Sequence, residues 1–135
     1  MAMTSVTTMT ELMKELQVCE RQGKLSFIFA SANWCTPCKH IKPSFNALMK
    51  RWSDYGVAIG VINFNIDEAA QLGEYFNVSK LPYFICLLPF PHMTLTIKEL
   101  RLESATSSDL DRWVQNIMQK WLTQTHSWNS NKNAS

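Results

Sequence analysis

The sequence predicts an α/β domain with a central mixed β-sheet flanked by helices on both faces. Apolar, strand-like runs alternate with helical patterns through most of the chain, which is typical of parallel strands joined by helices. Two strand-like runs then follow one another near the end, which predicts an antiparallel pair. The 135 residues are 46% hydrophobic and 18% charged, and this is the composition of one packed domain rather than of a disordered chain.

The first helix is expected to have Thr10 as its N-cap and to stop at Gly23. Its Leu12, Leu16 and Cys19 recur at helical spacing. The expected elements that follow are a buried strand at 25–30, a helix at about 35–52 kinked by Pro43, a strand at 57–66, a short helix at 67–76, an apolar strand at 83–88 and a more polar edge strand at 94–102.

The last helix has the clearest pattern. Ser108 is the expected cap, with Asp111 three residues later in a capping-box-like arrangement. Apolar residues then recur at alternating intervals of three and one through Trp121, which predicts an amphipathic helix packed on the core. We expect one domain over residues 1–122, followed by a disordered tail at 123–135, which is rich in Ser and Asn.

The segment that carries chemistry is Trp34-Cys35-Thr36-Pro37-Cys38-Lys39, between a buried strand and a helix. Two cysteines at this spacing can close a small disulfide ring. The free N–H groups and the positive dipole end of the helix stabilise a thiolate, so the pKa of Cys35 should fall below the free value of about 8.5. We expect Cys35, at the solvent-facing start, to be the nucleophile and Cys38, one turn in, to be the resolving thiol.

Two other interpretations of the cysteine pair are a zinc half-site and two merely structural cysteines. The second half of a zinc site is missing, because Cys19 and Cys86 stand alone and His40 makes no ligand-spaced pair with another histidine. Structural cysteines would not need Trp34 before them and Pro37 between them. We expect no metal and no bound organic cofactor.

Charge and hydropathy exclude other classes of partner. Thirteen basic and eleven acidic residues give a net charge of +2, so nothing points to nucleic acid or to an anionic membrane. The apolar runs at 57–64 and 81–90 are shorter than the roughly 20 residues of a membrane-spanning helix. Residues 1–20 lack an apolar core and contain three glutamates, so we expect a reducing, cytoplasmic location.

Other segments match one family together with the cysteine motif. Pro43 lies five residues after Cys38, the run 65–68 ends a strand with acidic residues, and the run 78–82 ends in Leu81-Pro82. Over roughly residues 5–122, the chain resembles the thioredoxin family. The resemblance implies the thioredoxin fold, and with it a thiol–disulfide oxidoreductase that reduces protein disulfides by cycling Cys35 and Cys38 between dithiol and disulfide.

The resemblance also implies the partners and the binding face. Electrons would come from a thioredoxin reductase or a low-molecular-weight thiol, and the protein would act as a monomer on disulfide-containing proteins. Pro82 would follow a cis peptide bond, and the backbone of Leu81 would pair with an extended substrate. Trp34, Pro37, Leu81 and Pro82 would form a flat apolar face on which the substrate docks.

The sequence departs from the family pattern at several positions. A buried aspartate six residues before the first cysteine is replaced by Phe29, and the lysine that accompanies it by Asn63. Loss of both partners avoids an uncompensated buried charge, but Cys38 loses a group that would help to deprotonate it, so we expect slow resolution of the mixed disulfide.

Two further departures lie late in the chain. The segment Ser104-Ala105-Thr106 replaces a family glycine, and the turn at 89–93 is unusually aromatic and proline-rich. The substitutions at Phe29 and Asn63, together with the turn at 89–93, leave open a second interpretation, in which the protein is a thioredoxin-fold binding or assembly module with little turnover.

Overall fold

The computed structural model describes residues 3–89 and 100–134, with side chains through residue 124. One five-stranded sheet in the order β1-β3-β2-β4-β5 forms its centre. Strands β1, β2 and β3 are parallel, whereas β4 runs antiparallel to both β2 and β5. The elements are β1 (Thr4–Ser5), α1 (Met9–Arg21), β2 (Leu25–Ser31), α2 (Thr36–Tyr55), β3 (Ile59–Asn65), α3 (Ala70–Tyr75), β4 (Tyr83–Leu87), β5 (Arg101–Glu103) and α4 (Ser107–Ala134).

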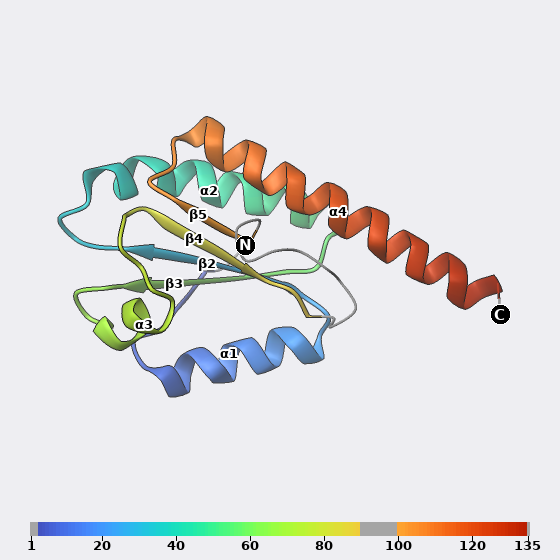
Figure 1. The fold of residues 1–135 in the computed structure, drawn as a ribbon, viewed down its shortest axis with the longest axis horizontal. Helices are drawn as coiled ribbons and strands as arrows, with labels where there is room; N and C mark the ends of the chain where they lie inside the picture. Colours follow the sequence, from blue (N-terminus) through green and yellow to red (C-terminus); the bar gives the residue numbers. More distant parts are fainter. Residues whose placement is uncertain (1–2, 90–99, 135) are drawn as a thin grey trace.

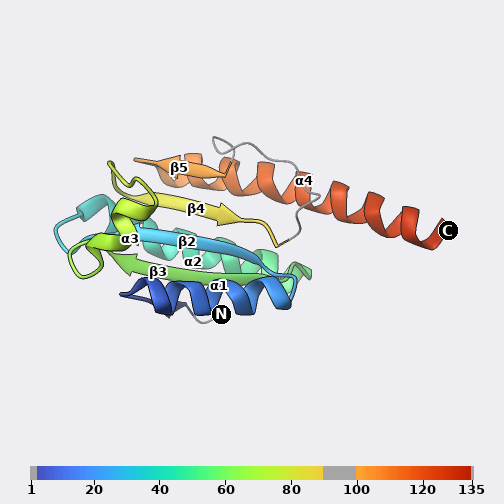
Figure 2. The same cartoon turned by 60° about the horizontal axis from the view of Figure 1, so that its bottom comes forward.

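Helices cover both faces of the sheet, as the sequence predicts. Helices α2 and α4 lie together over one face, and α1 and α3 lie over the other (Figures 1 and 2). A first core cluster packs under α2 and α4 and includes Phe27, Phe29 and Phe84. A second core cluster packs under α1 and α3 and includes Ile28, Leu72 and Phe76. Successive residues of β2 alternate between the two clusters, which explains why this central strand is apolar on both faces.

Both predicted helix caps are wrong by two residues. The N-cap of α1 is Thr8, whose hydroxyl accepts a hydrogen bond from the Glu11 N–H at 3.1 Å. At the start of α4, the Thr106 hydroxyl accepts from the Asp109 N–H at 3.2 Å, and the Asp109 carboxylate accepts from the Thr106 N–H at 3.1 Å. Each pair has the spacing of a capping box, which satisfies N–H groups that the first helical turn leaves free.

The C-terminal part of the chain also differs from the expectation. Helix α4 continues to Ala134, through the segment for which the sequence predicts a disordered tail. Residues 107–134 contain neither glycine nor proline, so no residue of the usual helix-ending types interrupts the helix. The predicted strand at 94–102 lies partly outside the described residues, as does most of the turn at 89–93, and β5 begins at Arg101. Strand β1 has only two residues and was not predicted.

Strand pairing brings the functional segments to one end of the sheet. Ala30, near the end of β2, pairs with Tyr83, the first residue of β4. Tyr83 pairs on its other side with Glu103, the last residue of β5. The loop that leads from β2 to Cys35, the Leu81–Pro82 segment before β4 and the turn after β5 therefore meet at this end.

Candidate active site

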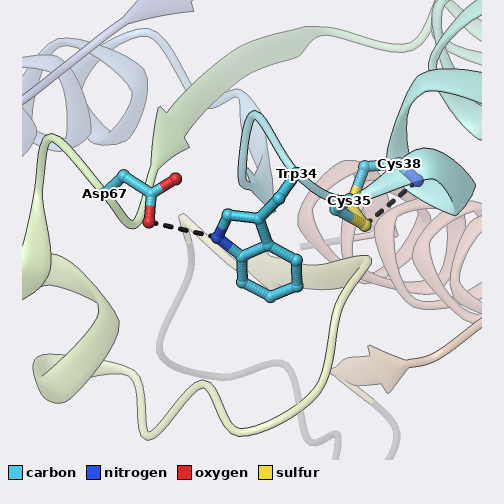
Figure 3. Close-up of a disulfide and its surroundings, with 4 residues drawn as sticks. All are labelled: Trp34, Cys35, Cys38 and Asp67. Atoms are coloured by element: carbon cyan, nitrogen blue, oxygen red, sulfur yellow. Dashed lines mark hydrogen bonds between the residues drawn. A yellow bond between two sulfur atoms is a disulfide. The ribbon is translucent and has the colours of Figure 1, made fainter.

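The two motif cysteines form a disulfide at the start of α2. Their sulfur atoms are 2.19 Å apart, and their Cα atoms are 5.3 Å apart. Cys35 is the N-cap of the helix, and its Sγ accepts a hydrogen bond from the Cys38 backbone N–H at 3.2 Å (Figure 3). A free N–H of the first helical turn is thus directed at the first sulfur, which is the arrangement that favours negative charge there.

Both cysteines are buried, with Cys35 4% exposed and Cys38 2% exposed. The expectation that Cys35 faces solvent is therefore wrong for the disulfide state. Its side chain turns back over the first turn of α2 to cap the helix, and both residues belong to the first core cluster. Thr36 and Pro37, between them, are exposed.

Trp34 is the exposed aromatic residue beside the disulfide, with 68% of its surface accessible. Its indole extends away from the sulfurs towards Asp67, and Nε1 donates a hydrogen bond to Oδ1 of that residue at 3.2 Å (Figure 3). Asn65 supports both partners, because its Oδ1 accepts from the Asp67 N–H at 2.9 Å and its Nδ2 donates to Asn33 Oδ1 at 2.7 Å. The ring is thus held in one orientation although most of it is exposed.

The hydrogen bonds of Asn65 that support Trp34 and Asp67 were not predicted from the sequence. The Asn-x-Asp spacing of residues 65–67 is the available signal, since an asparagine side chain readily accepts from the backbone two residues later.

The peptide bond between Leu81 and Pro82 is cis. Leu81 is half-buried and packs against both core clusters, whereas Pro82 is buried. The Ser104 N–H donates to the Pro82 carbonyl at 2.9 Å. Ser104 itself has a φ of 51°, in the left-handed region that glycine adopts most easily.

Comparison with known proteins decides the family. The thioredoxin family model matches residues 5–99. The chain belongs to the thioredoxin family.

Several thioredoxins are similar to the chain. Thioredoxin-1 of Drosophila yakuba is 32% identical over 85 residues, which cover 63% of this chain and 75% of that protein. The germline-specific thioredoxin Deadhead of Drosophila melanogaster has 27% identity and a TM-score of 0.64, and the match covers 89% of this chain and 98% of that one. A thioredoxin h from poplar has a similar fold, with a TM-score of 0.70 at 22% identity, and the match covers 86% of this chain and 96% of that one.

Thioredoxins are protein-disulfide oxidoreductases, and the chain has their cysteine pair in the disulfide state. The protein is therefore a thiol–disulfide oxidoreductase that reduces protein disulfides through Cys35 and Cys38. Nothing in the comparisons favours the binding-module interpretation.

Aromatic side chains fill the core at the position where the usual thioredoxin pattern has a buried ion pair. Phe29 is 2% exposed, and Asn63 is its register partner on β3. The Phe29 ring stacks on Phe84 and also contacts Phe45, with ring centroids 4.9 Å and 5.7 Å away. Phe29 and the two active-site cysteines share the first core cluster, so the surroundings of Cys38 on this side are apolar.

The two other cysteines are free and buried. Burial raises the pKa of the Cys86 thiol far above its usual range, which disfavours its thiolate form. Cys19 lies on α1, and its side chain lies close to Gly60 of β3. Their surroundings fit small apolar core residues rather than redox groups.

Two absences can be stated for the part of the chain that the structure describes. Among the side chains that the structure describes, in residues 3–89 and 100–124, no three His, Cys, Asp or Glu groups lie together so that they could hold a metal ion. Within residues 3–89 and 100–134, no helix is both long enough and apolar enough to cross a membrane.

Proposed function

We propose that Cys35 is the nucleophile and Cys38 the resolving thiol of this oxidoreductase. In the reduced protein, the Cys35 thiolate attacks one sulfur of a substrate disulfide, and the other substrate sulfur leaves as a thiolate. Cys38 then loses its proton and attacks the Cys35 sulfur, which releases the second substrate thiol. The substrate gains two electrons, and the protein loses two as it forms the Cys35–Cys38 disulfide.

The observation that carries this assignment is the hydrogen bond from the Cys38 N–H to the Cys35 sulfur. It marks Cys35 as the sulfur at the N-cap, where the helix dipole and a backbone donor both stabilise an anion. Cys38 lies inside the first turn and is less exposed. The first attack is thus assigned to the sulfur whose thiolate the fold stabilises.

Substrates dock on an apolar docking face formed by Trp34, Pro37, Leu81 and Pro82. Trp34 and Pro37 supply its exposed part, Leu81 is half-buried, and Pro82 supplies shape more than surface because it is buried. The backbone of Leu81 pairs with an extended substrate segment. The pairing of Ala30 with Tyr83 places Leu81 and Pro82 beside the end of β2, which supports their role in substrate docking.

An electron donor must reduce the Cys35–Cys38 disulfide after each cycle. In the family this donor is generally thioredoxin reductase, and a low-molecular-weight thiol is the alternative. The protein acts as a monomer in the cytoplasm, in electron transport that maintains cell redox homeostasis. It needs no bound cofactor beyond its own disulfide. These proposals rest on membership of the thioredoxin family.

The roles of the two thiols are tested by insulin reduction with dithiothreitol as electron source. We expect turnover by wild type and no turnover by Cys35→Ser. When pre-reduced Cys38→Ser is mixed with insulin in the absence of dithiothreitol, we expect a trapped mixed disulfide, which dithiothreitol added afterwards releases. Cys19→Ala is the matched control, because it removes a buried thiol away from the motif, and it should keep wild-type turnover. Turnover by Cys35→Ser at the wild-type rate would overturn the assignment.

A further inference from the structure

Residues 77–82, between α3 and β4, contain the Leu81–Pro82 pair and are called the docking segment below. The residues that flank it are Phe76 and Tyr83, and both are buried, with 2% and 7% exposure. They belong to the second core cluster. The position of the docking segment at the end of the sheet therefore depends on what holds these two flanking residues.

One side chain, Arg101 of β5, holds both of them. An Nη atom of its guanidinium donates hydrogen bonds to the Phe76 carbonyl and, at 3.1 Å, to the Tyr83 hydroxyl. The guanidinium carbon also lies 5.5 Å from the centre of the Phe76 ring and 5.9 Å from that of Tyr83. Both distances are within the roughly 6 Å over which a cation is attracted to an aromatic face.

The register of the sheet explains how Arg101 reaches these groups. Arg101 pairs with Ile85 across β4 and β5, and Ile85 belongs to the second core cluster. Cross-strand partners project from the same face of a sheet, and Tyr83 is the diagonal neighbour two residues along β4. A planar guanidinium can hydrogen-bond at its edge while its face lies against a ring, which an ammonium group cannot do.

A second link from the same part of the chain acts on the docking segment itself. The Ser104 N–H, just after β5, donates to the Pro82 carbonyl at 2.9 Å. The β5 region therefore contacts Phe76 before the segment, Pro82 at its end and Tyr83 after it. None of these contacts involves Cys35 or Cys38, so they bear on the position of the segment and not on the chemistry of the sulfurs.

We propose that Arg101 is a positioning residue that fixes the docking segment and thereby sets the rate at which protein disulfides, but not small disulfides, are reduced. The inference rests on the proposed function, in which Leu81 and Pro82 receive the substrate chain. A small disulfide reaches Cys35 without pairing along this segment. A protein disulfide needs the segment in place before its sulfur can approach.

The test uses the full-length reduced protein in single-turnover reactions with insulin and with 4,4′-dithiodipyridine. Arg101→Lys keeps the charge but removes the planar group. We expect the rate constant for insulin to fall about three- to tenfold, which is the factor that corresponds to the net free energy of about one hydrogen bond. The dithiodipyridine rate constant should stay within about twofold of wild type, because the thiolate is unchanged. Arg51→Lys, at an exposed arginine on α2, is the matched control and should leave both rates unchanged.

A second variant keeps the test decisive if Arg101→Lys folds poorly. Tyr83→Phe removes one acceptor but keeps the ring, so it should lower the insulin rate by a smaller factor and leave the dithiodipyridine rate unchanged. Equal losses with both substrates, or no loss with either, would overturn the role of Arg101. Failure of the proposed function gives a different result, because wild type itself would then react with dithiodipyridine but not with insulin.

Discussion

The ring of Phe29 lies almost parallel to that of Phe84, with centroids 4.9 Å apart and planes 10° from parallel. Phe45 contacts both rings, at 5.7 Å and 5.1 Å between centroids. These three side chains join β2, β4 and α2 within the first core cluster, to which both active-site cysteines also belong. The position that would carry a buried acid in the usual thioredoxin pattern thus holds a central part of the first core cluster.

Phe29→Ala should therefore be strongly destabilising. Removing a fully buried phenylalanine typically costs about 3–5 kcal/mol, because it removes buried apolar area and leaves a cavity. Denaturant unfolding of the oxidised protein measures the change. Tyr55→Ala is the control, since Tyr55 is 71% exposed and its loss should matter little. A cost for Phe29→Ala no larger than that of the control would contradict the packing described above.

The same apolar surroundings should prolong the mixed disulfide between Cys35 and a substrate. In the proposed cycle Cys38 must lose a proton before it attacks, and Phe29 provides no base to accept it. The double variant Phe29→Asp with Asn63→Lys places opposite charges on register partners, and it should shorten the mixed-disulfide lifetime at least about tenfold by supplying a general base. Acid quenching followed by mass spectrometry measures this lifetime.

Asn63→Lys alone is the control for that experiment, because it adds the cation without the base. Its mixed disulfide should decay at the wild-type rate. Equal lifetimes in the double variant and in wild type would show that Cys38 obtains no help from a carboxylate at this position.

Gly60 and Cys19 should behave as a coupled pair. A Cβ added at Gly60 would lie 2.4 Å from the Cys19 sulfur, so Gly60→Ala forces α1 and β3 apart. We expect a loss of about 1–3 kcal/mol, the usual cost of overpacking a core. Adding Cys19→Ala to Gly60→Ala should recover much of that loss, because the clashing sulfur is gone. A double-mutant cycle of unfolding free energies tests this, and strict additivity would argue against the contact.

The start of α4 should make stability depend on pH. Hydrogen bonds from the Thr106 backbone and side chain lower the pKa of the Asp109 carboxyl in the folded protein. A lowered folded-state pKa means that the stabilisation is present above the unfolded-state pKa and is lost as the pH falls through the folded-state value. Wild type should therefore be more stable than Asp109→Asn at neutral pH, and the difference should shrink at acid pH as the carboxyl becomes protonated. Unfolding curves at neutral and at acid pH give this comparison, and a constant difference would be evidence against it.

The sequence predicts the features that depend on local pattern. The buried strand before Trp34 is a short continuous apolar run, and the helix after Cys35 and the amphipathic helix near the C-terminus each have a periodicity that one short window contains. The cysteine motif adds the chemistry, since its spacing and the helix start are both local.

Features that depend on competition or on distant contacts could not be predicted in this way. Thr8 and Thr106 each lie near other Ser or Thr residues that could also cap a helix. Glu11, three residues after Thr8, distinguishes Thr8 from Thr10, but Asp109 does not distinguish Thr106 from Ser108, because Asp111 lies three residues after Ser108. Arg101 has no local pattern to mark it, because its partners at Phe76 and Tyr83 are far away in the sequence. The burial of Cys35 depends on how its side chain caps α2, which spacing alone does not give.

Strand β5 comes late in the chain, and this order matters while the protein is being made. A nascent chain that has grown only through β4 already carries both cysteines and the docking segment, but it does not yet contain Arg101 or Ser104. Chains leave the ribosome N-terminus first. For that interval the chain contains both thiols but lacks the residues that we propose to fix the docking segment. Discrimination between protein disulfides and small disulfides is therefore expected only after β5 has been made and has docked on β4.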